Sequence, residues 1–147
     1  MADPADPDPA DLDRIRTLLD APSPAVLAVY RADGSAAVSP VWFRFHDDRF
    51  EVVIATGDPK LGHLERDPRC VLVVFEPVIP FRKVEIRCAA ELATDGVAAA
   101  RLAIATRYLG TELGRRFADQ RGDRGVVLRL PASAARVTDL EAILPPG

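Results

Sequence analysis

The sequence predicts a mainly β fold, a small antiparallel barrel with helices appended to it. Short runs of apolar or alternating residues, each of strand length, recur along the whole chain. Turn residues separate the first runs closely enough for hairpins. Helical spacing, by contrast, is confined to a few segments between the strands. The predicted strands are residues 25–31, 36–45, 50–55, 70–75, 82–92, 125–131 and 134–138.

The size and composition of the chain fit one globular domain. It has 147 residues, of which 48% are hydrophobic and 28% are charged, as in ordinary globular proteins. No apolar run reaches the ~18 residues that a membrane-spanning helix requires. The acidic, Pro-rich N-terminus does not resemble a signal peptide. We therefore expect a cytoplasmic protein without a membrane partner.

Acidic residues gather at the N-terminus. Residues 1–10 combine Asp with Pro and Ala, so we expect a disordered acidic tail, followed by one domain at residues 11–147. The net charge is −3, but without the first 13 residues the chain has 17 acidic and 19 basic residues, a net charge of +2. Such a nearly neutral domain offers no basic field for a nucleic acid.

The first predicted elements are a helix and a hairpin. Residues 11–20 place apolar side chains at helical spacing, and prolines follow them. A tight turn with an Asp-Gly pair separates two strands, residues 25–31 and 36–45. Pro40 lies inside the second strand, so it marks a sheet edge, a bulge or a break where a ligand meets free backbone.

The third strand leads into a turn and a helix start. Residues 50–55 are followed by Gly57, a turn residue, by Asp58, a good N-cap, and by Pro59, which suits the first helical position. Free N–H groups at a helix start attract anions, and Lys60 adds a positive charge there. These residues predict a short helix that ends before the next Asp-Pro pair, and a seat for a phosphate. An ordinary turn with a surface Lys is the alternative.

The second half of the chain mixes strands and helices. Residues 70–75 are continuously apolar, which is typical of a strand buried on both faces. An apolar loop with two prolines and a strand at residues 82–92 follow. One helix ends near Leu109, and a second short helix precedes the last two strands. Cys70 and Cys88 belong to no CxxC pattern, so we expect buried free thiols.

Side-chain chemistry is sparse in this sequence. The two His residues belong to no cluster with metal-ligand spacing. No motif of a serine nucleophile, a dinucleotide-binding turn or a P-loop occurs, and the scattered carboxylates define no acid–base pair. If the protein is an enzyme, we expect a bound cofactor to carry its chemistry.

Six short motifs follow one another along the chain: residues 33–35 (DGS), 38–43 (VSPVWF), 55–60 (ATGDPK), 64–69 (LERDPR), 80–87 (PFRKVEIR) and 107–110 (RYLG). In their order and spacing they resemble those of the pyridoxamine 5′-phosphate oxidase-like FMN-binding split-barrel superfamily. The narrower resemblance is to its actinobacterial branch, which uses FMN or the deazaflavin coenzyme F-420. It covers roughly residues 25–138 and rests on order and spacing, since no single motif is diagnostic.

The resemblance implies a six-stranded antiparallel split β-barrel and a homodimer with the cofactor in grooves at the subunit interface. It implies that Lys60 binds the cofactor phosphate, helped by Thr56, and that the ring system lies against Val41, Trp42 and Phe43. Ser39 stands where true pyridoxamine phosphate oxidases have a phosphate-binding Arg, so we do not expect that reaction. The cofactor-binding residues expected from the resemblance are Ser39, Pro40, Val41, Trp42, Thr56, Lys60, His63, Pro80, Phe81, Arg82 and Tyr108.

Structural roles are the alternative for several of these residues. Trp42 could pack in the core or at the dimer contact, and His63 could lie at the surface. Arg82 could pair with a neighbouring glutamate, and Tyr108 could end a packed helix. Two functions remain open. The first is an oxidoreductase that uses F-420 or FMN for hydride transfer to a small organic substrate. The second is a protein that binds or stores flavin, deazaflavin or haem without turnover.

Overall fold

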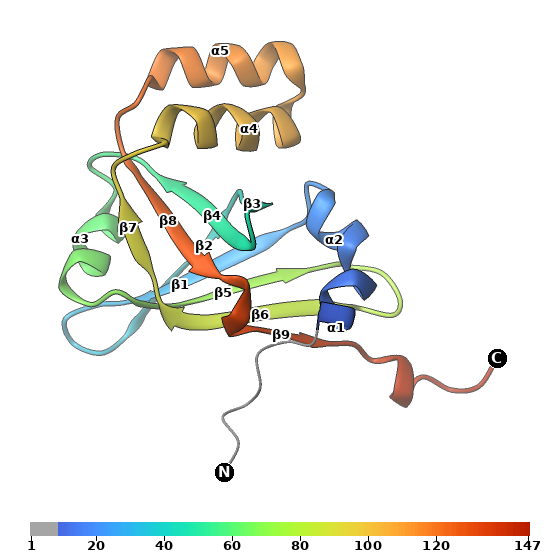
Figure 1. Ribbon diagram of the computed structural model, residues 1–147. Helices are drawn as coiled ribbons and strands as arrows, with labels where there is room; N and C mark the ends of the chain where they lie inside the picture. Colours follow the sequence, from blue (N-terminus) through green and yellow to red (C-terminus); the bar gives the residue numbers. More distant parts are fainter. Residues whose placement is uncertain (1–8) are drawn as a thin grey trace.

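Two antiparallel sheets form the body of the protein, and a pair of helices lies on the outer face of one of them (Figure 1). The computed structural model describes residues 9–147. Most of the predicted acidic tail, residues 1–8, lies outside the described residues. Residues 9 and 10 belong to the first helix, α1 (Pro9–Arg14).

The first sheet has five strands in the order β2-β1-β5-β6-β9. Every neighbouring pair is antiparallel. Alternate residues of β1 and β5 are buried, so one face of the sheet points into the core. The strands are β1 (Ala25–Tyr30), β2 (Ala36–Val41), β5 (Arg69–Phe75), β6 (Lys83–Ala89) and β9 (Ala135–Thr138).

Pro40 lies on the edge of this sheet. Only β1 pairs with β2, and Pro40 is opposite Val26 in that pairing. The outer side of β2 carries no partner strand among the described residues, so a proline there removes no bond from a central ladder. Of the three interpretations of Pro40, the sheet edge is confirmed.

The second sheet has four strands in the order β3-β4-β8-β7. Its pairs are also antiparallel. The turn between the first two strands contains Asp47 and Asp48 with φ of 52° and 56°, the left-handed conformation that a tight hairpin turn requires. The strands are β3 (Arg44–His46), β4 (Arg49–Ile54), β7 (Glu91–Ala93) and β8 (Val126–Pro131).

Two predicted strands are divided between the sheets. Residues 36–45 form β2 in the first sheet and β3 in the second, and residues 82–92 likewise become β6 and β7. In both places a bend lets one chain segment contribute to both walls of the barrel, which no single straight strand can do. The described residues therefore form nine strands in two sheets, and the six-stranded count is not confirmed.

Side chains of a helix hold the bend between β2 and β3. Phe43 is fully buried at this bend, and its ring lies 6.3 Å from the ring of Phe50. Its carbonyl accepts a 3.1 Å bond from Arg107 Nε, and its N–H donates across 3.4 Å to Tyr108 Oη. Since buried backbone groups without partners are costly, these two bonds allow the strand to break inside the core.

The helices agree with the prediction except at the N-terminus. The expected helix at residues 11–20 is two short helices, α1 and α2 (Arg16–Asp20), which meet at the buried Ile15. The helix predicted from Pro59 is α3 (Pro59–Arg66). The remaining helices are α4 (Val97–Leu109) and α5 (Thr111–Arg121), and the 3-10 turns are η1 (Ala132–Ala134) and η2 (Glu141–Ile143).

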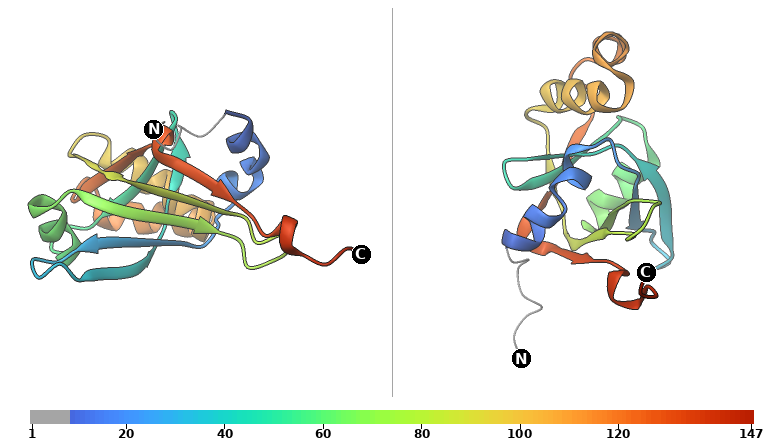
Figure 2. Two further views of the ribbon diagram at one scale, coloured as in Figure 1. Left: turned by 90° about the horizontal axis from the view of Figure 1, so that it is seen from below. Right: turned by 90° about the vertical axis from the view of Figure 1, so that its right-hand side faces the viewer.

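Helices α4 and α5 form a tight hairpin beside the second sheet (Figures 1 and 2). Gly110 links them with φ of 85°. Gly114 packs so closely on α4 that a Cβ atom there would lie 2.8 Å from the backbone of Thr106. Glycine is therefore required at the contact, and it sets how closely α5 approaches α4.

The apolar interior lies between the two sheets. Leu27, Leu72, Ile86 and Leu130 are fully buried there, and Leu64 of α3 joins them. Burial of such side chains stabilises each by roughly 1.5–3 kcal/mol relative to exposure. Within residues 9–147 no helix is long and apolar enough to cross a membrane.

Candidate functional site

A pocket of about 310 Å³ lies between β4 and the α4–α5 hairpin, beside the end of β2. It combines an apolar wall with charged groups, and three stretches that are distant in sequence contribute to it, within residues 40–42, 52–60 and 101–121. The lining residues are Pro40, Val41, Trp42, Val52, Val53, Ile54, Ala55, Asp58, Lys60, Arg101, Ile104, Ala105, Phe117 and Arg121.

The start of α3 forms the acidic and basic corner of this pocket. Asp58 is the N-cap, and its Oδ1 accepts a 2.9 Å bond from the Lys60 N–H. Its Oδ2 lies 2.9 Å from Lys60 Nζ. Burial raises the pKa of Asp58, but the bonds from the Lys60 backbone and ammonium outweigh it, and the net pKa is lowered. The carboxylate thus stays charged and is already engaged by Lys60.

Arginines supply the positive charge on the opposite side. Arg101 is 4% exposed, and its guanidinium donates to the carbonyls of Gly122, at 2.6 Å, and Arg124. Arg121 stacks over the Phe117 ring at 3.7 Å. An adjoining pocket of about 320 Å³ is lined by Ala55, Thr56, Arg101, Arg121 and Arg124. Arg101 and Arg121 therefore border both pockets.

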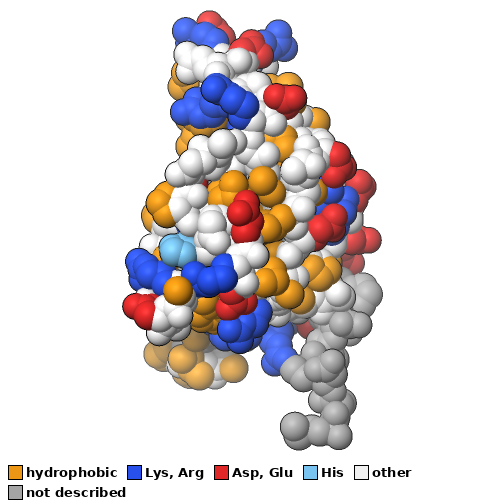
Figure 3. All heavy atoms as spheres, turned by 90° about the vertical axis from the view of Figure 1, so that its left-hand side faces the viewer, with side chains coloured by type: hydrophobic (Ala, Val, Ile, Leu, Met, Phe, Trp, Pro, Cys, Tyr) orange, Lys and Arg blue, Asp and Glu red, His pale blue; other side chains and the backbone are white. Residues whose placement is uncertain are grey.

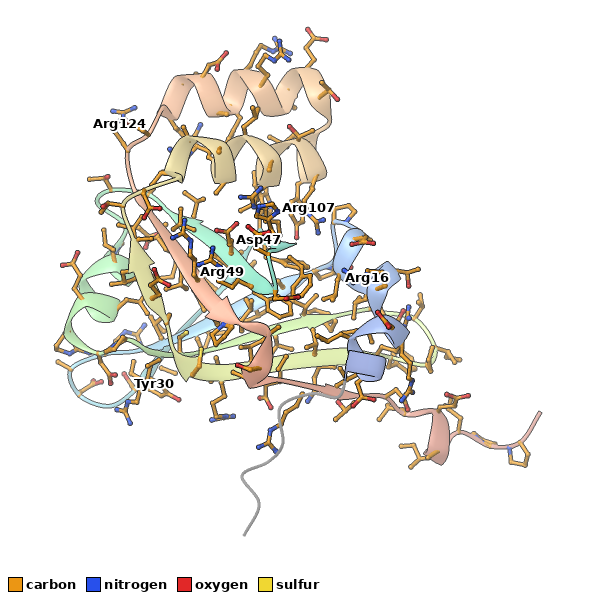
Figure 4. All side chains as sticks on the ribbon, viewed as in Figure 1. Arg16, Tyr30, Asp47, Arg49, Arg107 and Arg124 are labelled. Atoms are coloured by element: carbon orange, nitrogen blue, oxygen red, sulfur yellow. The ribbon has the colours of Figure 1, made fainter. Side chains whose placement is uncertain are left out.

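The mutual effect of these arginines indicates a positive potential. Burial lowers the pKa of Arg101, and the nearby Arg121 and Arg124 lower it further, against a smaller opposing effect of Asp123. Like charges disfavour each other's protonated form, yet an arginine stays protonated at any ordinary pH. The uncompensated charge is thus available to an anion. In Figure 3 Arg side chains lie over the helical pair together with acidic ones, and Figure 4 places Arg124 at one end of the pair, on the connection from α5 to β8.

Aromatic side chains form the apolar wall. Trp42 stacks on Tyr108, with centroids 5.2 Å apart and an interplanar angle of 8°, and it meets Phe117 at 5.4 Å. The Tyr108 hydroxyl donates to the Ser23 carbonyl at 2.9 Å, and burial raises the pKa of this phenol, which keeps it neutral. Tyr108 lies behind Trp42 and does not line the pocket.

The structure brings together part of the predicted set. Pro40, Val41, Trp42 and Lys60 line the first pocket, and Thr56 lines the adjoining one. Their contact with a cofactor stays a prediction.

Two further predicted residues lie close to this group without lining it. Ser39 is half-buried on β2 directly before Pro40, and its buried Oγ has no hydrogen-bond partner within residues 9–147. His63 is half-buried on α3, one turn beyond Lys60. Neither residue appears in the lining of the pockets described above.

The remaining predicted residues lie elsewhere. Pro80, Phe81 and Arg82 belong to the connection from β5 to β6, which Figure 1 shows at the end of the barrel away from α3. Arg82 forms a two-pronged pair with Glu76, at 2.6 and 2.9 Å, and donates to the Arg14 carbonyl at 3.1 Å. Arg82 therefore pairs with a neighbouring glutamate, which was the structural alternative for this residue. Within one protomer, Pro80, Phe81 and Arg82 do not line the pocket.

Among the lining residues that were not predicted from the sequence are Arg101, Phe117 and Arg121, a charged and aromatic group from the helical pair. Arg101 falls on the same helical face as apolar residues of α4, which was a usable signal, because a charge on a buried face needs a reason. Arg121 follows Phe117 by four positions on α5, the spacing of neighbours on one helix face. Neither pattern states which sheet the helices cover, so the site itself was not predictable.

The lining fits a planar ring that carries an anionic arm. The aromatic and aliphatic side chains near Trp42 suit a ring, while Lys60 and the arginines suit a phosphate or carboxylate. The N–H groups at the start of α3 add no free donor, because Pro59 has none and those of Lys60 and Leu61 donate to Asp58. Asp58 opposes an anion only in part, because its charge is already shared with Lys60.

Comparisons with known proteins identify the family. A model described as pyridoxamine 5′-phosphate oxidase matches residues 12–138, whereas a comparison with curated proteins finds no match. A conserved hypothetical protein from Mycobacterium tuberculosis has a similar structure, with a TM-score of 0.77 and 21% identity over 92% of this chain and 89% of that one.

Two other solved structures carry functional names. An F420 reductase is similar with a TM-score of 0.67 and 25% identity, over 82% of this chain and 94% of its own. HutZ, the haem storage protein of Vibrio cholerae, has a TM-score of 0.65 and 16% identity, over 85% of this chain and 92% of its own. With a family match over most of its length and the same fold in these structures, this chain belongs to the pyridoxamine 5′-phosphate oxidase family.

Proposed function

We propose that the protein is an oxidoreductase that binds coenzyme F-420 or FMN and serves hydride transfer to a small organic substrate. One observation carries the proposal: a single pocket joins an apolar aromatic wall, around Trp42, to a cationic end built from Lys60, Arg101 and Arg121. A ring system with a phosphate-bearing arm has the same division into an apolar and an anionic part.

The anionic arm is assigned to the end where α3 begins. The Lys60 ammonium lies on one side of this end, and Arg101 and Arg121 on the other. Hydrogen bonds to charged partners contribute about 1.5–3 kcal/mol each. Binding a phosphate here requires Lys60 to share its ammonium between the ligand and Asp58, which lies 2.9 Å away.

The arginines of the adjoining pocket favour the longer of the two cofactors. FMN ends in one phosphate, whereas the arm of the deazaflavin continues beyond its phosphodiester. Arg101, Arg121 and Arg124 extend the positive surface past Thr56, away from Trp42. The 25% identity to an F420 reductase points the same way.

The side chains of this chain serve binding and orientation rather than proton transfer. When bound, the coenzyme supplies the hydride chemistry. Trp42 and Phe117 give a ring a fixed apolar surface, and the Tyr108 ring supports Trp42 from behind. The carboxylate of Asp58 is held charged by Lys60, and arginine does not release a proton. The apolar wall also limits the access of water to whatever lies against it.

Haem storage without turnover is the second candidate, and the Vibrio cholerae structure is its support. Haem iron needs an axial His, Cys, Met or Tyr ligand. Within the described residues, the lining of the main pocket contains none of these. This composition favours a coenzyme without a metal.

A binding titration with FMN and, separately, with F-420 tests the proposal. The wild-type protein should bind one of them, and Lys60→Ala should weaken binding by about tenfold or more, because a charge-assisted contact is lost. Lys83→Ala, on β6 and remote from the pocket, is the matched control and should leave affinity unchanged. Asp58→Asn keeps the helix cap but removes the opposing charge, so it should strengthen binding by about threefold.

The outcomes separate the hypotheses. If neither cofactor binds the folded wild-type protein, the cofactor proposal fails. If Lys60→Ala binds as well as wild type, the phosphate lies elsewhere. Oxidation of the reduced, bound cofactor by a panel of quinones and conjugated enones distinguishes an enzyme from a carrier, which would bind tightly and leave the reduced cofactor unchanged.

A further inference from the structure

Cys70 and Cys88 face each other across two central strands. Cys70 on β5 is directly opposite Cys88 on β6, so the two side chains lie on the same face of the sheet. That face is the core face, which also carries the fully buried Leu72 and Ile86. Both cysteines are free thiols, and neither lines a pocket described above.

The pairing register sets the distance between the two residues. At one end of this ladder the Ala90 N–H donates to the Pro68 carbonyl, and at the other the Glu76 N–H donates to the Arg82 carbonyl. In an antiparallel ladder, pairs that exchange hydrogen bonds alternate with pairs that do not. Counting from either bonded end in steps of two reaches Cys70 and Cys88, so they form a hydrogen-bonded pair. Cα atoms in such a pair are about 5.5 Å apart, inside the range of about 4.4–6.8 Å that disulfides span.

The two thiols differ in access to solvent. Cys70 is 1% exposed, whereas Cys88 is half-buried near the end of β6. The adjacent Cys88 thiol, together with burial, raises the pKa of Cys70, and the adjacent Cys70 thiol in turn lowers the pKa of Cys88. Cys88 is therefore the sulfur that an oxidant reaches, and Cys70 is the sulfur held beside it.

We infer that Cys70 and Cys88 form an oxidisable dithiol, which a hydroperoxide converts into a disulfide between β5 and β6. The Cys88 thiolate attacks one peroxide oxygen, the O–O bond breaks, and an alcohol or water leaves with a proton from solution. The resulting Cys88 sulfenic acid is attacked by the Cys70 sulfur. The S–O bond breaks, the S–S bond forms, and the Cys70 proton leaves with the hydroxyl as water. Two thiols lose two electrons, and the peroxide gains them.

The proposed disulfide lies outside the cofactor pocket, so the two sites can be tested independently. The disulfide would join the ends of a segment that contains the β5–β6 connection, with the exposed Val78, Ile79 and Phe81. No residue of β5 or β6 lines the pocket. Oxidation should therefore leave cofactor affinity unchanged, and the fate of this proposal is independent of the proposed function.

Mass spectrometry of the native protein tests the inference. The reduced full-length chain is treated with hydrogen peroxide, denatured, and exposed to a thiol-alkylating reagent. We expect a mass loss of about 2 Da, no alkylation at either cysteine, and one cross-linked peptide pair in a non-reducing digest. Dithiothreitol should return the original mass and two alkylatable thiols.

Two variants assign the roles of the sulfurs. Cys70→Ser should leave Cys88 as a sulfenic acid that dimedone traps, and Cys88→Ser should leave Cys70 unreacted under the same treatment. If both thiols of the peroxide-treated wild type remain alkylatable, or if Cys88 advances to a sulfinic acid with Cys70 still free, the inference is wrong. The wild-type measurement decides the question even if the Ser variants fold poorly.

Discussion

Arg44 and Arg129 share one buried carboxylate, that of Glu51, whereas Arg101 and Arg121 donate only to backbone carbonyls beside the pocket. Glu51 is 2% exposed, and its oxygens lie 2.6 Å from Arg44 Nε and 3.1 Å from Arg129 Nε. Arg101 donates to the carbonyls of Gly122 and Arg124. Within residues 9–147, no salt bridge joins a pocket arginine to a carboxylate.

The difference separates charges that hold the fold from charges that remain for a ligand. A carboxylate neutralises the guanidinium with which it pairs. Removing one partner of such a buried pair strongly lowers the free energy of unfolding, because the other charge is left without compensation. A guanidinium held by carbonyls is fixed in place but keeps its full positive charge. Arg107 is also held by carbonyls but serves the fold. It donates to four of them and packs over the Phe43 ring, so it connects α4 to α2 and has no donor left for a ligand (Figure 4).

The largest effect is expected from Glu51→Gln, which breaks the paired group. It should lower the free energy of unfolding at pH 7 by about 3 kcal/mol. Arg44 loses its counter-charge, and Arg129 loses its buried partner and keeps only the more distant Glu91 and Asp95. Urea denaturation measures it. Glu112→Gln is the control, since Glu112 is 89% exposed in its side chain and its pair with Arg116 at 4.0 Å contributes little.

The same variant has a defined pH signature. Burial raises the pKa of Glu51, but the bonds from Arg129 and Arg44 outweigh burial, so its folded pKa lies below the ordinary value of 4.5. The stabilisation is thus present above pH 4.5 and is lost as the pH falls through the folded pKa. Wild type should lose stability in acid more steeply than Glu51→Gln. Equal slopes for the two proteins would contradict the pairing.

A smaller effect, on binding rather than stability, is expected from Arg121→Gln. Loss of one unneutralised charge should weaken the binding of FMN or F-420 by about tenfold, with the loss shrinking as salt is added. Arg115→Gln removes the same charge from an exposed position of α5 and should change neither affinity nor fold. If both variants bind equally well, the pocket arginines have no special role.

The smallest effect is expected from Tyr108→Phe. The variant loses the bond to the Ser23 carbonyl and the long, 3.4 Å bond from the Phe43 N–H, but it keeps the ring that stacks on Trp42. The free energy of unfolding should therefore fall by about 1 kcal/mol. Cofactor affinity should stay within about twofold of wild type. A tenfold loss of affinity in the folded variant would instead place the hydroxyl in the groove, as the resemblance implies.

The local chemistry of the sequence was sufficient for the elements themselves. Asp58 caps α3, Pro59 opens it, and Gly34 turns the first hairpin with φ of 86°, all as their residue types predict. These features depend on neighbours only a few positions apart. The family resemblance is confirmed by the family match over residues 12–138. Two of its motifs, residues 33–35 and 55–60, lie in a turn and at a helix start, which fold locally.

Tertiary structure determined how these elements combine into two sheets and a pocket. A run such as residues 36–45 is uniformly strand-like, and only the need to serve two sheets makes it bend at Phe43. Arg82 lies within the motif at residues 80–87, yet it pairs with Glu76 at 2.6 Å. The reason is that the β5–β6 connection lies at the end of the barrel away from α3 (Figure 1). Arg101 and Arg121 are 20 positions apart in the sequence and meet only because Gly114 lets α5 pack against α4. Spacing determines which face of its own element a side chain occupies, whereas packing between elements determines what that face meets.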